Sequence, residues 1–211
     1  MKLEECKNYL CASGLIPSNS ARNFSNPALS VTLAIKRNII RPRQKVLEIG
    51  SGNLRNVLYI ANSIDKVDLY CYEIKNTIEK FLNNYKYFKE HGGKIIEDEF
   101  DKEKYDAILS TFFLETICPQ EKRICILKLI KKSLSKRGVL VASFRGYTGV
   151  LGSKYKKCPE GEGLISPLHT FIKPYSIIEI EHLLASCGFN KVIQLQNYKV
   201  NIPKNIHIVA S

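Results

Sequence analysis

Long uncharged apolar runs are absent from this chain of 211 residues, which is 45% hydrophobic and 25% charged. Because a membrane-spanning helix needs about 20 predominantly apolar residues, the sequence predicts no such helix. The first residues, MKLEECKNYL, carry acid and amide groups where a secretory signal needs an apolar stretch. A cytoplasmic protein is therefore expected, and the ordinary composition with a mean hydropathy of −0.14 excludes a disordered chain.

Paired cysteine motifs, internal repeats and long linkers are also missing. The seven cysteines are odd in number and form no Cys-x-x-Cys pair, so neither a disulfide framework nor a zinc site is expected. The thiols are predicted to be reduced. No Pro/Gly/Ser-rich linker is long enough to separate two folding units. A chain of this length can bury roughly 70% of its unfolded surface, so one domain over 1–211 is predicted.

Acidic residues are outnumbered, with 20 Asp and Glu against 32 Lys and Arg, and the net charge is +12. A surplus of this size favours an anionic partner, either nucleic acid, a phosphorylated metabolite or an oxyanion. Net charge describes the long-range field and not a site, so it does not choose among these partners.

Short apolar runs alternate with stretches of helical length in the middle of the chain. The runs cover 45–50, 67–73, 94–97, 105–111 and 138–144, and the intervening stretches cover 53–62, 76–91 and 119–135. Continuous apolar strands are buried on both faces, which favours a mostly parallel sheet covered by helices on both sides. Helices are also expected near 3–12, 28–40 and 176–187, and two closing antiparallel strands at 192–200 and 205–211. The predicted fold is α/β: a Rossmann-like, doubly wound, mostly parallel seven-stranded sheet with an antiparallel C-terminal strand pair and added N-terminal helices.

A glycine turn follows the first predicted strand. Glu48-Ile49-Gly50-Ser51-Gly52-Asn53-Leu54-Arg55 runs directly into a helix, which places the turn at the carboxyl edge of the sheet, where nucleotide-like ligands bind. A dinucleotide fingerprint needs a third glycine where this chain has Arg55. The Gly-Lys-[Ser/Thr] ending of a phosphate loop is absent as well. Both phosphate-binding interpretations are therefore weakened.

Acidic residues stand at three consecutive strand ends. Glu48 precedes the turn, Glu73 ends the second strand, and Glu97 or Asp98 ends the third. A carboxylate at a strand end can accept both hydroxyls of a ribose, as Glu73 is placed to do. Glu48 can lie near an ammonium group, and the third acid can accept from an adenine amino group. Each acid alone could face solvent, but together they predict a nucleoside ligand with a charged amino-acid tail.

The sequence resembles a known family at these positions. The stretches VLEIGSGNLRN, CYE, EDEF, YDAILST and GVLVASF look like successive motifs of the class I S-adenosylmethionine-dependent methyltransferases, and the resemblance covers about 27–145. Two stretches, GSGNLRNVLYIA and YDAILSTFFL, are most similar to the tellurite-resistance branch. The chain departs from that branch at Leu54, where the branch has a third glycine and where leucine requires a side chain turned into the helix–sheet packing.

The resemblance implies S-adenosylmethionine as cofactor and one methyltransferase domain. Within it, 1–44 would form the N-terminal helices, 45–145 the cofactor-binding core, 146–174 a substrate lid and 175–211 the C-terminal helix and strand pair. The residues expected to bind the cofactor are Glu48, Gly50, Ser51, Gly52, Asn53, Arg55, Glu73, Ile74, Glu97, Asp98, Ser110 and Thr111. Glu115 is expected to contribute much less, and no metal site is expected.

Methyl transfer from a sulfonium needs donor and nucleophile held in line, and needs a base only if the acceptor arrives protonated. Ser110-Thr111-Phe112-Phe113 stands where adenine methyltransferases usually carry Pro-Pro-[Tyr/Phe], which argues against a DNA adenine methyltransferase. Cys118-Pro119 reverses the order of a cytosine-C5 nucleophile motif, which argues against that class too.

The candidate catalytic residues are Arg145, Tyr147 and His169, at and after the end of the fifth predicted strand. Arg145 follows a strand at the ligand edge, where a fixed cation could hold an anionic acceptor. His169 could act as a base near neutral pH, or could be an ordinary loop histidine. The segment 146–174 holds five glycines and three prolines, and a loop of this length is usually functional.

Three functions remain open at this point. The first is a methyltransferase for a small, anionic acceptor, and the second is an RNA or other nucleic-acid methyltransferase. The second is favoured by the net charge and by Lys154, Lys156 and Lys157, which could track phosphates or simply be solvated. The third is a cofactor-binding protein without catalysis. The sequence identifies neither the acceptor atom nor the oligomeric state.

Overall fold

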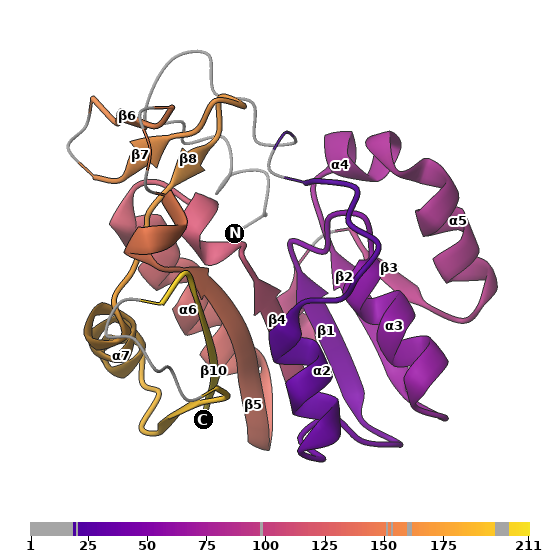
Figure 1. The fold of residues 1–211 in the computed structure, drawn as a ribbon. Coiled ribbons are helices and arrows are strands. Elements are labelled where there is room, and N and C mark those ends of the chain that lie inside the picture. The colour runs from indigo at the N-terminus through magenta and orange to yellow at the C-terminus, as the bar shows by residue number, and fades with distance from the viewer. Residues whose placement is uncertain are drawn as a thin grey trace.

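A seven-stranded sheet forms the centre of the protein (Figure 1). The computed structural model describes residues 19, 21–97, 99–150, 152, 154–159, 162–196 and 203–211. The strand order is β3-β2-β1-β4-β5-β10-β9. The strands are β1 Lys45–Ile49, β2 Asp68–Tyr72, β3 Lys94–Ile96, β4 Tyr105–Thr111, β5 Leu134–Arg145, β9 Val192–Gln194 and β10 Asn205–Ala210. The first five are parallel, and β10 pairs antiparallel with both β5 and β9, which confirms the predicted fold class.

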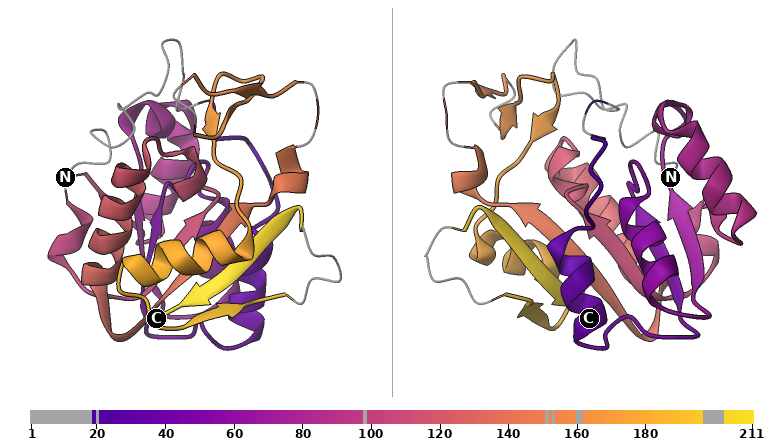
Figure 2. Two further views of the ribbon diagram at one scale, coloured as in Figure 1. Left: turned by 90° about the vertical axis from the view of Figure 1, so that its left-hand side faces the viewer. Right: turned by 45° about the vertical axis from the view of Figure 1, so that its right-hand side comes forward.

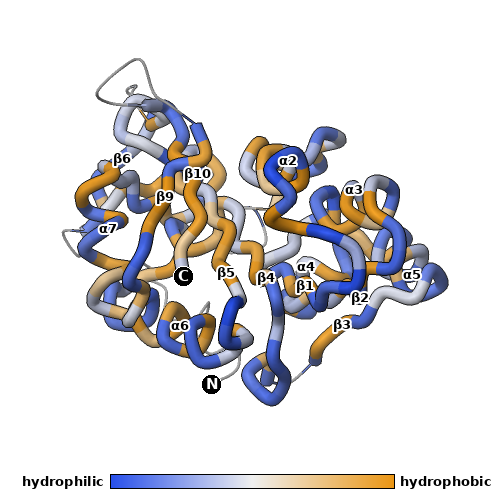
Figure 3. Tube along the Cα trace, turned by 90° about the horizontal axis from the view of Figure 1, so that it is seen from below, coloured by the Kyte–Doolittle hydropathy of each residue, from blue (hydrophilic) through white to orange (hydrophobic). Residues whose placement is uncertain are grey.

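Helices cover both faces of this sheet (Figure 2). They are α2 Leu29–Lys36, α3 Arg55–Ser63, α4 Lys75–Lys80, α5 Leu82–Glu90, α6 Gln120–Ser133 and α7 Ile177–Ser186. One hydrophobic cluster joins α6 and α7 to the sheet through residues such as Leu127 and Leu184. A second joins α2, α3 and α5 to the opposite face through residues such as Val31, Val57 and Phe88. The hydrophobic stretches of β5 and β10 therefore lie in the interior (Figure 3).

Several predicted boundaries were wrong. The helix expected over 76–91 is two helices, α4 and α5, because the backbone at Phe81 (φ −120°, ψ 33°) leaves the helical region. The strand expected at 138–144 begins already at Leu134, because an irregularity between the Tyr105 and Ala107 pairings accommodates the intervening polar residues. Of the strand expected at 192–200, the structure describes 192–196, and β9 covers Val192–Gln194 of it. The helix expected near 3–12 lies outside the described residues.

The long segment 146–174 carries secondary structure of its own. It contains a 3₁₀ helix, η4 Tyr147–Val150, and the strands β6 Lys156–Lys157, β7 Leu164–Ile165 and β8 Phe171–Ile172, which form a small antiparallel sheet. This small sheet lies beyond the carboxyl ends of the parallel strands (Figure 1). An ion pair joins Glu162, which precedes β7, to Arg123, a buried residue of α6.

The expectation about cysteine is corrected at one position. Cys71, Cys125, Cys158 and Cys187 are free thiols, as expected, but Cys118 is disulfide-bonded. The absence of a local Cys-x-x-Cys pair does not exclude a disulfide, because a disulfide joins residues that are close in the folded chain. In the part of the chain that the structure describes, no helix has the length and hydropathy to cross a bilayer.

Candidate functional site

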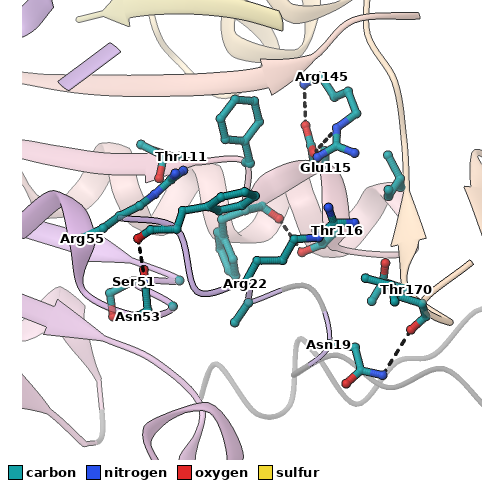
Figure 4. Close-up of a pocket in the computed structure, with 18 of the residues that line it drawn as sticks. Asn19, Arg22, Ser51, Asn53, Arg55, Thr111, Glu115, Thr116, Arg145 and Thr170 are labelled. Carbon is teal, nitrogen blue, oxygen red and sulfur yellow. Dashed lines mark hydrogen bonds and ion pairs between the residues drawn. The ribbon is translucent and has the colours of Figure 1, made fainter. Parts of the chain in front are cut away.

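A cavity of about 410 Å³ lies at the carboxyl ends of β1, β2, β4 and β5 (Figure 4). Ligand sites in doubly wound folds occur at this edge of the sheet. The cavity brings together eight of the residues that the sequence predicted as site residues: Gly50, Ser51, Gly52, Asn53, Arg55, Glu73, Thr111 and Arg145. We name the two sides of this cavity the glycine-turn side, around Gly50–Asn53, and the β5 side, around Arg145.

The glycine-turn side is shaped by the backbone. Gly50 and Gly52 have φ values of +70° and +57°, in the left-handed region that favours glycine. A Cβ on Gly50 would lie 2.3 Å from Cδ2 of Phe113, so this position also needs the missing side chain. Leu54, the departure from the tellurite-resistance pattern, has φ +67° and is fully buried in the cluster that packs α3 on the sheet.

Glu73 ties the end of β2 to this turn. Its Oε2 accepts a hydrogen bond from Gly52 N at 2.8 Å, and its Oε1 accepts one from Ile74 N at 2.8 Å. The Tyr85 hydroxyl of α5 supports the same turn from behind by donating to Gly52 O at 2.9 Å. A carboxylate oxygen can accept two hydrogen bonds, so Glu73 keeps acceptor capacity toward the cavity.

Glu48 lies behind the cavity wall. Its carboxylate is fully buried, and its Oε1 accepts from Asn56 Nδ2 at 2.6 Å and from Thr111 Oγ1 at 3.3 Å. Among the described residues its Oε2 has no hydrogen-bond partner. Burial raises the pKa of Glu48 to about 7, although the hydrogen bond from Asn56 and the charge of Arg55 oppose this shift. Glu48 thus contacts two residues that line the cavity, Asn56 and Thr111.

Residues 21–26, which we name the N-terminal strap, cross the glycine-turn side. Asn53 Nδ2 donates to Phe24 O at 2.8 Å, and Arg55 Nη1 donates to Asn26 O at 3.0 Å. The Arg55 guanidinium also lies 4.8 Å from the centre of the Phe24 ring, a cation–π distance. Asn53 and Arg55 therefore hold the strap, a role that the sequence analysis missed because their partners lie about 30 residues away.

Two oppositely charged residues face each other on the β5 side. Glu115, in the 3₁₀ helix η3 Leu114–Thr116, is 1% exposed and accepts a hydrogen bond from Arg145 N. Its Oε1 lies 3.4 Å from Arg145 Nε (Figure 4). Burial raises the pKa of Glu115 to about 7, against the opposing effect of the Arg145 charge and backbone amide. Glu115 was expected to contribute little to cofactor binding, and it lines the cavity together with Thr116 and Thr170.

The remaining predicted site residues lie outside this cavity. Tyr147 is 40% exposed and its hydroxyl donates to Glu179 at 2.9 Å, while His169 and Glu97 are exposed. Ile74 and Ser110 are buried, and neither lines the cavity. Asp98 lies outside the described residues. The roles of these residues stay predictions, and for Tyr147 and His169 the position gives no support for contact with a bound acceptor.

Most of the other residues that line the cavity were not predicted from the sequence, among them Asn56, Glu115, and the aromatic residues Phe24 and Phe113. Glu115 follows a strand end, as the predicted acids do, but by four residues. A search that extended into the first turn after each strand would have included it. Phe24 gives no comparable signal, since it reaches the cavity only through the strap.

Solved methyltransferases share the fold described above. CcbJ from Streptomyces caelestis has a TM-score of 0.64 at 11% identity, over 99% of this chain and 95% of its own. A 1,6-didemethyltoxoflavin-N1-methyltransferase from Burkholderia thailandensis, solved with that compound and S-adenosylhomocysteine, has a TM-score of 0.60 at 15% identity, over 86% and 75%. PigF, solved with S-adenosylhomocysteine, has a TM-score of 0.58 at 18% identity, over 79% and 50%.

The chain therefore has the Rossmann-like fold of the class I S-adenosylmethionine-dependent methyltransferases. It spans about half the length of three similar structures, at 55%, 50% and 53% of their chains. No protein-family model matches the chain, and a sequence search finds no matching curated protein. Likeness at these identities establishes the fold, and function rests on the site.

Proposed function

We propose that this protein is an S-adenosylmethionine-dependent methyltransferase that acts on a small, anionic acceptor. The observation that carries the proposal is the Gly50–Gly52 turn, held by Glu73 at the carboxyl edge of the sheet and open to the cavity. A nucleoside with a charged tail fits this chemistry, because Gly50 and Gly52 carry no side chains and Glu73 offers acceptor oxygens.

The residues of the glycine-turn side fit the cofactor. Glu73 would accept from the ribose hydroxyls, and Ser51 and Gly52 would border the amino-acid tail. Glu48, which accepts hydrogen bonds from Asn56 and Thr111, would hold these two residues near the ammonium group. Glu97 or Asp98 remains the proposed partner of the adenine amino group. When bound, the cofactor supplies an electrophilic methyl group on a sulfonium.

The β5 side is the proposed acceptor site. Arg145 lines the cavity, as does Lys204, so a negatively charged acceptor group would meet cations there. The segment 146–174 contributes Tyr155, Leu168 and Thr170 to the same lining, which supports its role as a lid within one catalytic domain. The lid would exclude water around the reacting groups and hold the acceptor in line with the methyl group.

A nucleic-acid acceptor is the second candidate. Lys154, Lys156 and Lys157 are exposed on the small sheet beside the cavity, and the chain carries a net charge of +12. The likeness to the tellurite-resistance branch stays a hypothesis that concerns the acceptor alone. Measured turnover of an acceptor would distinguish both candidates from a cofactor-binding protein without catalysis.

Calorimetry with the cofactor product tests the proposal directly. S-adenosylhomocysteine is expected to bind and to raise the melting temperature, since a ligand selective for the folded state stabilises it. NAD is the matched control, and it should not bind because the turn lacks the dinucleotide fingerprint. Binding of NAD without binding of S-adenosylhomocysteine would disprove the assignment.

A further inference from the structure

Glu115 has no part in the function proposed above, although it is a nearly fully buried carboxylate in the wall of the cavity. A buried charge is costly unless it is paired and hydrogen-bonded. Both oxygens of Glu115 are directed at one residue, Arg145: Oε2 accepts from its backbone N, and Oε1 lies 3.4 Å from its Nε. The carboxylate thus fixes both the backbone and the side chain of Arg145.

The outer end of Arg145 remains open. Its two terminal nitrogens make no hydrogen bond to any residue that the structure describes. The aliphatic part is confined as well, since a Cβ on Gly149 would lie 2.8 Å from Arg145 Cγ. Arg145 is held at its backbone and at Nε, and it packs against Gly149 along its stem. A guanidinium held in this way loses little further freedom when it binds a ligand.

We propose that Glu115 is a positioning residue that fixes Arg145 as a preformed fork for a carboxylate group of the acceptor. This inference rests on the proposed function and specifies its substrate class. A carboxylate is planar and matches the two terminal nitrogens of a guanidinium with two parallel hydrogen bonds. The hydroxyl of Thr170 lines the same side and can donate to a carboxylate oxygen, whereas the hydroxyl of Thr116 donates to Phe113 O.

The alternative to this positioning role is that Glu115 only neutralises the charge of Arg145. If Glu115 only neutralised Arg145, the pair would present no net attraction to an anion, and binding would depend on Lys204. The ion pair involves Nε at 3.4 Å, and the guanidinium charge is shared with the two terminal nitrogens. Tighter binding of an anion than of its neutral counterpart would therefore distinguish an anchoring role from simple neutralisation.

The experiment uses the full chain saturated with S-adenosylhomocysteine and sodium benzoate as the probe, with benzamide as its neutral counterpart. Binding is measured from the changes in NMR chemical shifts of the protein as the probe is added. Wild type is expected to bind benzoate at least tenfold more tightly than benzamide. Arg145→Lys should weaken benzoate binding about tenfold, because it keeps a cation beside Glu115 but loses the fork.

Glu115→Gln is expected to weaken benzoate binding about fivefold while the affinity for S-adenosylhomocysteine stays within twofold of wild type. A merely structural role would change both affinities. The double variant should bind benzoate no more weakly than Arg145→Lys alone, since the two residues act as one unit. Glu103→Gln, which breaks an exposed ion pair with Lys45, is the matched control and should change nothing.

The failures are distinguishable. If the wild-type protein does not bind S-adenosylhomocysteine, the proposed function is overturned. If that ligand binds but benzoate binds no better than benzamide, this inference alone is overturned. Equal benzoate affinities for wild type and Glu115→Gln, or additive losses in the double variant, would overturn the positioning role. If Glu115→Gln does not fold, unchanged benzoate binding by Arg145→Lys would still overturn the fork.

Discussion

The two sides of the cavity are built by different means. On the glycine-turn side, the chain conformation does most of the shaping: Gly50 and Gly52 have positive φ, and Glu73 binds the amide of Gly52. On the β5 side, two side chains from different elements, Glu115 and Arg145, create the charge pattern. A side built from a continuous turn leaves a recognisable pattern in the sequence. A side built from distant side chains leaves almost none.

The largest effect is expected from a substitution that disturbs the backbone of the glycine-turn side. Gly50→Ala should lower the free energy of unfolding by about 3 kcal/mol. Alanine is strained in the left-handed backbone conformation, and its Cβ would overpack against Phe113. Urea denaturation measures the loss, and calorimetry should detect no S-adenosylhomocysteine binding. Gly92→Ala is the matched control, because its φ is +84° but a Cβ would meet nothing within 4 Å. A loss at Gly50 no larger than at Gly92 would contradict the role of Phe113.

A pH effect of similar size tests the buried acid behind the turn. Burial raises the pKa of Glu48 to about 7, so its neutral form is favoured in the folded state. The resulting stability is fully present below the unfolded pKa, near 4, and is lost as pH rises through about 7. Linkage limits the loss to about 4 kcal/mol. Glu48→Gln should therefore gain stability relative to wild type between pH 5 and pH 9.

The comparison of Glu48→Gln with wild type by urea denaturation cancels the contributions of other groups. His207, whose pKa burial lowers to about 4, and Glu115 titrate equally in both proteins. A difference in stability that stays constant from pH 5 to pH 9 would show that Glu48 titrates near its ordinary pKa.

Glu73→Ala should weaken S-adenosylhomocysteine binding by about 1.5–3 kcal/mol, the range for hydrogen bonds to a charged group. The circular dichroism spectrum should be unchanged. Glu79→Ala is the control, since Glu79 is exposed and pairs only loosely with Lys75 at 3.9 Å. Calorimetric affinities that are equal for wild type and Glu73→Ala would remove Glu73 from the site.

The smallest effect is expected on the β5 side, at the exposed lysines of the lid. Replacing Lys154, Lys156 and Lys157 with alanine should leave turnover of a small acceptor nearly unchanged, because exposed lysines contribute little to a local site. Arg145→Ala should reduce turnover clearly. Binding to an RNA oligonucleotide at several salt concentrations provides the discriminating measurement. A large, salt-dependent defect in the triple variant would favour the nucleic-acid acceptor.

Local patterns predicted much of the glycine-turn side. The apolar run at 45–50, the turn after it and Glu73 at the next strand end are each readable from a few neighbouring residues. The predicted order of strands and helices was confirmed for the same reason. The start of β5 was misplaced and the break at Phe81 was not predicted, because element boundaries depend on packing and pairing with distant segments.

The sequence by itself determined the sheet, the turn and the acids at the strand ends, because periodicity, glycine and short spacing act over a few residues. Only the tertiary structure decided which side chains meet. It placed Arg145 against Glu115, the strap against Asn53 and Arg55, and Tyr147 away from the cavity. These contacts join residues about 30 positions apart, and their geometry follows from how the helices and the small sheet pack on the strands.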